Sequence, residues 1–186
     1  MKVRFDRWWN FPAAMILFAA FMMTALKIQS TKWTDDLYLV NWLTFIGFFL
    51  GLAIGYSQFK NFFSKTLLFL YSILIVSYSL GTIYQPSVPW LARYESIYGR
   101  ITSIIDQFKN NVRIEDPILF LIFLAILVWI TSLTCGYYLS RSSRPWIPIL
   151  ISGISIFTIE YFDQVGTNLY TAFFIFFVLI FLSQFY

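Results

Sequence analysis

Long apolar runs with few or no charged residues alternate along this chain with short segments where Lys, Arg, Asp and Glu gather. Most runs have the length that an α-helix needs to cross a bilayer, whereas transmembrane β-strands are about ten residues long and alternate in polarity. Because a backbone in lipid must satisfy its own hydrogen bonds, continuous runs predict helices. The predicted spans are residues 11–28, 37–56, 66–84, 117–139, 146–161 and 169–186.

Local sequence signals mark where two of these spans begin. Asp116 is suited to cap a helix and Pro117 to occupy its first position, which predicts the start of the fourth span. The first span follows a basic segment and could be taken for a signal peptide. However, residues 24–27 form a poor small-residue cleavage site, so we expect an uncleaved span.

The segment between the third and fourth spans has a different pattern. It follows a helix-breaking linker at residues 85–89 and is predicted to form an amphipathic helix at residues 90–109. Apolar residues recur there at spacings of three and four, at Trp90, Tyr94, Ile97, Ile101, Ile104, Ile105 and Phe108. This helix is too polar to span. It could lie on the outer membrane surface, or pack over the mouth of the bundle or under another domain.

Composition makes the membrane assignment firm. The chain is 59% hydrophobic and only 12% charged, whereas a soluble domain is nearer half apolar and a quarter charged. A soluble fold could not bury that much apolar surface. We therefore expect an all-α, polytopic helix bundle, a single membrane domain over residues 1–186, multi-pass in the plasma membrane with the lipid bilayer as its partner.

The distribution of charge predicts the orientation of the bundle. With the N-terminus in the cytoplasm, the inner segments hold seven bases and one acid, and the outer segments hold six bases and eight acids. This excess of bases inside follows the usual rule for membrane proteins, and six spans return the C-terminus to the cytoplasm. The outer bases are Lys27, Lys32, Arg93, Arg100, Lys109 and Arg113.

The available chemistry is narrow. The chain contains no histidine, which excludes His-based metal sites and His-activated nucleophiles. Its one cysteine, Cys135, lies in an apolar run and has no disulfide partner in the chain. The net charge of +4 fits membrane topology better than nucleic-acid binding, because no basic stripe exists. We predict no catalytic residue, no metal and no cofactor in this chain.

Small residues recur every fourth position in two predicted spans. Gly47, Gly51 and Gly55 share one face of the second span, and the fourth span carries a matching row. Such rows let helix backbones approach closely. They predict either association with another subunit or ordinary packing within this bundle. The second row is Ser132, Gly136 and Ser140.

Two acidic residues close to a predicted span are candidates for a polar site. Glu160 lies at the end of the fifth span, and Asp163 follows one turn later on the same face. Ionisable groups within a membrane are costly and often functional, so the pair could bind a substrate or a cation. Alternatively, both residues end a short helix at the outer interface, which we favour.

Six segments, in their order and spacing, resemble the N-terminal membrane region of bacterial transglutaminase-like (TgpA-type) membrane proteins. They consist of packing and boundary residues, and the resemblance covers nearly the whole chain. The segments are residues 7–14, 32–37, 51–59, 116–120, 136–141 and 144–146.

The resemblance implies a specific architecture. In that family a further span and an extracytoplasmic domain with papain-like Cys-His-Asp chemistry follow the membrane region. No such residue can be carried over, because the chain lacks histidine and Cys135 lies within a predicted span. Since the sixth span also ends without a charged flank, we expect a fragment of a longer protein.

The function expected from the sequence is therefore a membrane anchor and scaffold for an absent downstream domain, without enzymatic activity in this chain. The alternative is a small polytopic transporter or lipid-handling protein. A transporter built on internal symmetry should show a repeat between its halves, and none is visible. Substrate and oligomeric state stay open.

Overall fold

The computed structural model describes residues 10–84, 88–110, 118–142, 144–163 and 168–185. In these ranges the chain is all-helical. The helices are α1 (Phe11–Ser30), α2 (Tyr38–Tyr56), α3 (Asn61–Tyr84), α4 (Trp90–Lys109), α5 (Ile118–Ser142), α6 (Trp146–Phe162) and α7 (Leu169–Phe185).

A helix occupies each segment where one was predicted, and the amphipathic helix has the predicted bounds. Three helices extend beyond the predicted spans: α3 begins at Asn61 and not at residue 66, α1 continues to Ser30, and α5 continues to Ser142. An apolar run marks only the part of a helix that is suited to lipid. Backbone hydrogen bonding can continue the helix beyond that run. At α3, for example, the Ser64 amide already donates to the Lys60 carbonyl. The predicted cap at Asp116 and Pro117 lies outside the described residues.

Four of the described helices are long and apolar enough to cross a membrane: α1, α2, residues 61–82 of α3, and α5. The helices α6 and α7 have 17 residues each, and their apolar portions are shorter than the other four. The structure is thus that of a helical membrane protein with four long candidate spans.

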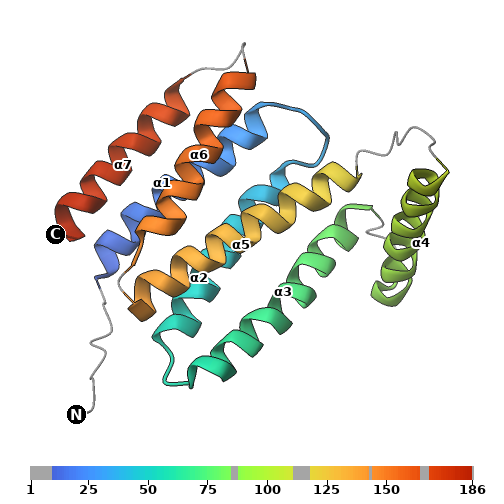
Figure 1. Cartoon of the computed structure of the whole chain (residues 1–186), viewed down its shortest axis with the longest axis horizontal. Coiled ribbons are helices and arrows are strands. Elements are labelled where there is room, and N and C mark those ends of the chain that lie inside the picture. Colours follow the sequence, from blue (N-terminus) through green and yellow to red (C-terminus); the bar gives the residue numbers. More distant parts are fainter. Residues whose placement is uncertain (1–9, 85–87, 111–117, 143, 164–167, 186) are drawn as a thin grey trace.

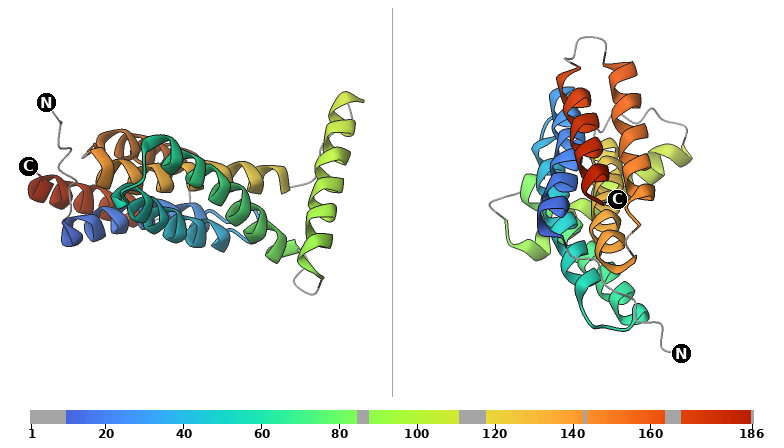
Figure 2. Two further views of the ribbon diagram at one scale, coloured as in Figure 1. Left: turned by 90° about the horizontal axis from the view of Figure 1, so that it is seen from below. Right: turned by 90° about the vertical axis from the view of Figure 1, so that its left-hand side faces the viewer.

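The six apolar helices run side by side, and α2 and α5 lie at the centre (Figure 1). The most extensive packing joins α2 to α5, and the next joins α1 to α7. α3 forms one flank of the bundle. α4 lies across one end of the bundle, nearly perpendicular to the other helices (Figure 2). We call this the α4 end; α1, α3 and α6 end there, and α2, α5 and α7 begin there.

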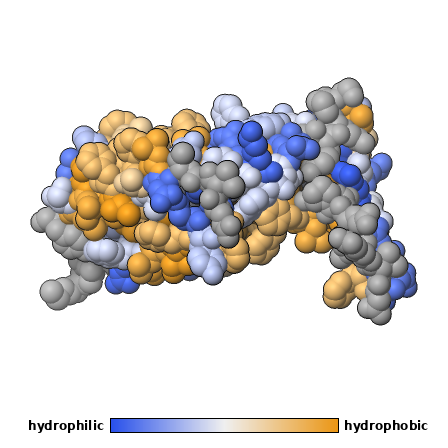
Figure 3. Space-filling view, turned by 90° about the horizontal axis from the view of Figure 1, so that it is seen from above, coloured by the Kyte–Doolittle hydropathy of each residue, from blue (hydrophilic) through white to orange (hydrophobic). Residues whose placement is uncertain are grey.

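The apolar core follows this arrangement. Its largest cluster centres on α2 and α5 and includes Trp129, which is 1% exposed. The indole Nε1 of Trp129 donates to the Ser72 Oγ at 2.8 Å, which joins α5 to α3. A buried tryptophan needs such an acceptor for its one polar atom. Outside the core, large apolar side chains cover much of the bundle, and hydrophilic residues gather towards the helix ends and around α4 (Figure 3).

Polar contacts fix two of the helix ends. At the start of α1, the Asn10 side chain accepts from the Ala13 amide at 3.3 Å, which caps the helix. At the opposite end of the bundle from α4, the guanidinium of Arg141 on α5 donates to the carbonyls of Ser57 and Phe59 and to the Asn61 side chain. Arg141 thus holds the turn between α2 and α3 against the end of α5.

The amphipathic helix α4 divides its apolar face between the bundle and the surface. Ile104 is buried, and Ile97 packs against the core cluster. Leu91, Tyr98 and Phe108 are about 70% exposed, at 68%, 70% and 73%. α4 therefore packs over the bundle with part of its apolar face and leaves the rest open.

Candidate functional site: a buried ion-paired cluster

A buried lysine stands at the centre of the most unusual polar feature of the bundle. Lys27 belongs to the last turn of α1, and its exposed fraction is 0%. The charge distribution predicts that Lys27 belongs to the bases on the outer side. In the structure it lies inside α1, which continues for a further turn to Ser30, and on the buried face of that helix. An unpaired ammonium in such a position would be strongly destabilising, so its partners matter.

The partners of Lys27 are the two acidic residues at the end of α6. Its Nζ atom lies 2.8 Å from the Asp163 Oδ2 and 3.8 Å from the Glu160 Oε2. The Thr171 hydroxyl on α7 donates to the same oxygen of Glu160. We call these four residues the Lys27 cluster. It joins α1 to α6 and α7, which lie more than a hundred residues further along the chain.

The charges of the Lys27 cluster do not balance. Two carboxylates face one ammonium, which leaves one net negative charge when all three groups are ionised. The carboxylates are partly accessible, at 19% for Glu160 and 15% for Asp163, while the lysine is not. Water at the α4 end can therefore reach the acids but not the base. The arrangement is suited to hold the helix ends together, because dissolved salt weakens a shielded ion pair less than an exposed one.

A layer of hydroxyl groups lies next to the cluster, further into the bundle. Thr24 is one turn before Lys27, and its Oγ1 lies 2.8 Å from the Ser152 Oγ on α6. Thr24 and Ser152 border a cavity of about 20 Å³, which has room for about one water molecule. Further hydroxyls around it belong to Thr44, Thr131, Ser132 and Ser155. Polar contacts thus join α1 to α6 at two successive levels, through Lys27 and Thr24.

The structure places Glu160 and Asp163 at the end of α6, with Asp163 at its C-cap. It brings them together with Lys27, which sequence analysis did not connect to them. One signal was present. Leu17, Ala20, Thr24 and Lys27 follow at spacings of three and four, so Lys27 continues the buried face of α1. Among the described residues no group of three or more His, Cys, Asp or Glu could hold a metal ion.

The two rows of small residues face each other between α2 and α5. A Cβ atom at Gly51 would lie 2.2 Å from the Leu133 carbonyl oxygen, and one at Gly136 would lie 2.2 Å from the Phe48 carbonyl oxygen. These separations mean that the two backbones touch without intervening side chains. Within this chain the rows therefore serve helix packing.

At the ends of the two rows the distance between α2 and α5 differs from one glycine to the next. At Gly55 the nearest group is the Ser140 Oγ, 2.1 Å from where a Cβ would lie. That hydroxyl also lies within hydrogen-bond distance of the Leu52 carbonyl on α2, at 3.2 Å. At Gly47 the space is looser, with Ser132 Cβ and Trp129 Cε3 both at 3.3 Å. The two helices are thus in close contact at Gly51 and Gly55 and further apart at Gly47.

Cys135 lies on α5 beside this contact. Its side chain is fully buried and free, within a cluster that includes Phe48, Leu52 and Leu139. A nucleophilic thiolate needs solvent access and a nearby cation or helix N-terminus. The burial of Cys135 denies it that access.

Comparison with known proteins adds no assignment. No family model matches the chain, no curated protein matches it, and no solved structure matches it. The transglutaminase-like resemblance therefore rests on the six sequence segments alone and stays a prediction.

Proposed function

We propose that this chain is a membrane anchor and scaffold, of the kind that carries an extracytoplasmic transglutaminase-like domain in the family it resembles. The observation that supports a scaffold is the direct backbone contact between α2 and α5 at Gly51 and Gly136. Helices that interlock at this separation cannot slide past each other without breaking the contact. The Lys27 cluster then joins α1, α6 and α7 at the α4 end.

The proposal includes six spans, with α6 and α7 crossing the membrane beside the four longer helices. At 1.5 Å per residue, 17 residues extend about 26 Å, close to the thickness of about 30 Å of a hydrocarbon core. Two contacts support this assignment: α7 packs along α1, and the ion pair of Lys27 with Asp163 holds the end of α6 level with the end of α1. Short spans are accommodated by local thinning of the bilayer.

The orientation belongs to the same proposal and has a direct test. We expect a cysteine at Asp35 or Ser103 to react with an impermeant thiol reagent added to intact cells, and a cysteine at Gln58 or Ser142 to react only after the membrane is opened. The first two positions are exposed at the α4 end, which the charge distribution puts outside, and the other two lie at the opposite end. Cys135→Ala provides the background. Labelling of Gln58→Cys in intact cells would reverse the orientation.

The rival proposal is a transporter, which would have to alternate between two arrangements of its helices. In a Cys135→Ala background, spin labels at Leu119 and Asn168 would report the distance between α5 and α7 at the α4 end. Labels at Gln58 and Gln184 would report α2 against α7 at the opposite end. All four positions are exposed.

For a scaffold we expect one narrow distance distribution for each pair in lipid nanodiscs, unchanged between pH 5 and pH 8 and by added Na⁺. Two populations that exchange weight with these conditions, in opposite senses at the two ends, would exclude the scaffold and favour the transporter.

A further inference from the structure

An open groove runs between α2 and α3, on the flank of the bundle away from the Lys27 cluster. Its volume is about 550 Å³, within the range of about 300–1,000 Å³ usual for sites that hold a small molecule. It exists because α3 packs loosely: only 17% of the span within α3 is buried, against 50–56% of those within α1, α2 and α5. The groove therefore opens sideways, onto the surface that faces lipid.

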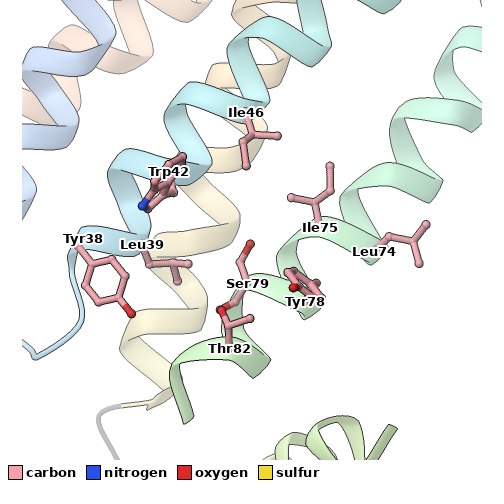
Figure 4. Close-up of a pocket in the computed structure, with 9 residues that line it drawn as sticks. All are labelled: Tyr38, Leu39, Trp42, Ile46, Leu74, Ile75, Tyr78, Ser79 and Thr82. Atoms are coloured by element: carbon pink, nitrogen blue, oxygen red, sulfur yellow. The ribbon is translucent and has the colours of Figure 1, made fainter. Parts of the chain in front are cut away.

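The groove changes in polarity along its length. Its inner part is lined by Ile46, Leu74 and Ile75, which carry no polar side-chain atom. Its part towards the α4 end carries hydroxyl and aromatic side chains, among them Tyr38 and Tyr78 (Figure 4). A membrane lipid has the same order of chemistry from the middle of the bilayer to its surface.

The polar part of the groove is rich in hydrogen-bond donors. The residues Tyr38, Tyr78 and Trp42 are 46%, 56% and 60% exposed. Their hydroxyl and indole N–H groups have no hydrogen-bond acceptor among the residues that the structure describes. Tyrosine and tryptophan take such positions at membrane interfaces, where the ring is in apolar surroundings and the polar atom is not. Ester carbonyl and phosphate oxygens of a glycerophospholipid are acceptors only.

A positive charge lies at the same end of the groove. The side chain of Arg93 on α4 packs over Gly81, next to Thr82 in the groove lining, and its Nε donates to the Val88 carbonyl at 2.8 Å. α4 thus brings a guanidinium to the polar end of the groove, and a cation there favours an anionic lipid headgroup.

From this combination we propose that the α2–α3 groove is a binding site for one glycerophospholipid of the leaflet at the α4 end. One acyl chain lies along Ile46, Leu74 and Ile75. The ester and phosphate oxygens accept from Tyr38, Tyr78 and Trp42, and the phosphate charge is complementary to Arg93. The site is independent of whether the chain carries a further domain.

Fluorescence quenching tests this site, because Trp42 lines it. The protein in detergent micelles is titrated with a phosphatidylglycerol whose acyl chains carry bromine at mid-chain. We expect saturable quenching at one lipid per chain, and the loss of most of that signal in Trp42→Phe. Removing two donors in Tyr38→Phe/Tyr78→Phe should weaken lipid binding by about tenfold.

The matched control is Tyr71→Phe/Tyr98→Phe, which removes two hydroxyls from exposed tyrosines that do not line the groove and should leave the affinity unchanged. Three results would overturn the site: quenching that never saturates, equal saturable quenching in Trp42→Phe, or an unchanged affinity in Tyr38→Phe/Tyr78→Phe. Equal affinity for a brominated fatty acid of the same length would also do so, since a free fatty acid has neither ester nor phosphate.

Discussion

Replacing Gly51 by alanine is expected to destabilise the bundle by about 3 kcal/mol, at the upper end of the usual effect of overpacking. The added methyl carbon would lie 2.2 Å from the Leu133 carbonyl oxygen and 2.9 Å from the Tyr137 amide nitrogen. Both groups are backbone, so no side-chain rotation can relieve the clash. The same change at Gly136 should be as severe, because its Cβ would meet the backbone of Phe48 and Leu52 at 2.2 Å and 2.7 Å.

Other helical glycines of this chain provide matched controls for the same one-carbon change. Around Gly99 nothing lies within 4 Å of the added carbon, and at Gly153 the nearest atoms belong to the Phe174 ring at 3.6 Å and 3.8 Å. At these two positions alanine should stabilise the protein by up to about 1 kcal/mol, because a helix favours alanine over glycine and nothing opposes the added carbon. Gly47→Ala should fall between these extremes, since its nearest neighbours lie at 3.3 Å.

Unfolding of the purified variants in mixed micelles of mild detergent and dodecyl sulfate measures these free energies. The prediction is an order: Gly51→Ala and Gly136→Ala least stable, Gly47→Ala intermediate, Gly99→Ala and Gly153→Ala at or above the wild type. If Gly51→Ala were as stable as Gly153→Ala, α2 and α5 would not be in backbone contact.

Periodicity along the chain was enough to predict the elements of this fold. An apolar run must become a helix in lipid, and the spacing of three and four in residues 90–109 identified α4 with its bounds. The helix ends were less predictable. Hydrogen bonding carries α3 back to Asn61 and α1 on to Ser30, past the residues where the apolar run stops.

Helix pairing could be predicted only in part. The spacing of the glycine and serine rows predicts a close contact on one face of each helix. It does not say which two faces meet, because any small row can pack against any other. That α2 takes α5 as its partner depends on the whole bundle, including Trp129 beneath Gly47 and Ser140 beside Gly55.

The Lys27 cluster shows why a site can escape sequence analysis. Lys27 and Asp163 are separated by 136 positions, and neither stands within a recognisable motif. A lysine near the end of a span is ordinarily an interface residue, because its long side chain can reach water. Only the packing of α6 and α7 against α1 removes that option and makes the two acids its partners.

Replacing Lys27 by methionine is therefore expected to destabilise the protein by about 2–3 kcal/mol. Methionine is apolar and similar in length, so the loss comes from leaving Asp163 and Glu160 without a counter-charge. Removing one partner of a fully buried pair costs about 3–5 kcal/mol, and the partial exposure of both acids, at 15% and 19%, reduces that figure. Lys32→Met is the matched control in the neighbouring loop, where the side chain is exposed and the change should have almost no effect.

A double-mutant cycle with Asp163→Asn separates the ion pair from the effect of the substitutions themselves. Asp163→Asn alone leaves the buried Lys27 with only the more distant Glu160, at 3.8 Å, and should also destabilise. In the double variant neither residue is charged. Its loss in free energy of unfolding should therefore be smaller than the sum of the losses in the two single variants, by about 1–3 kcal/mol. The same unfolding assay measures all four proteins. Losses that simply add would mean that Lys27 and Asp163 do not interact, and that other contacts hold the ends of α1 and α6 together.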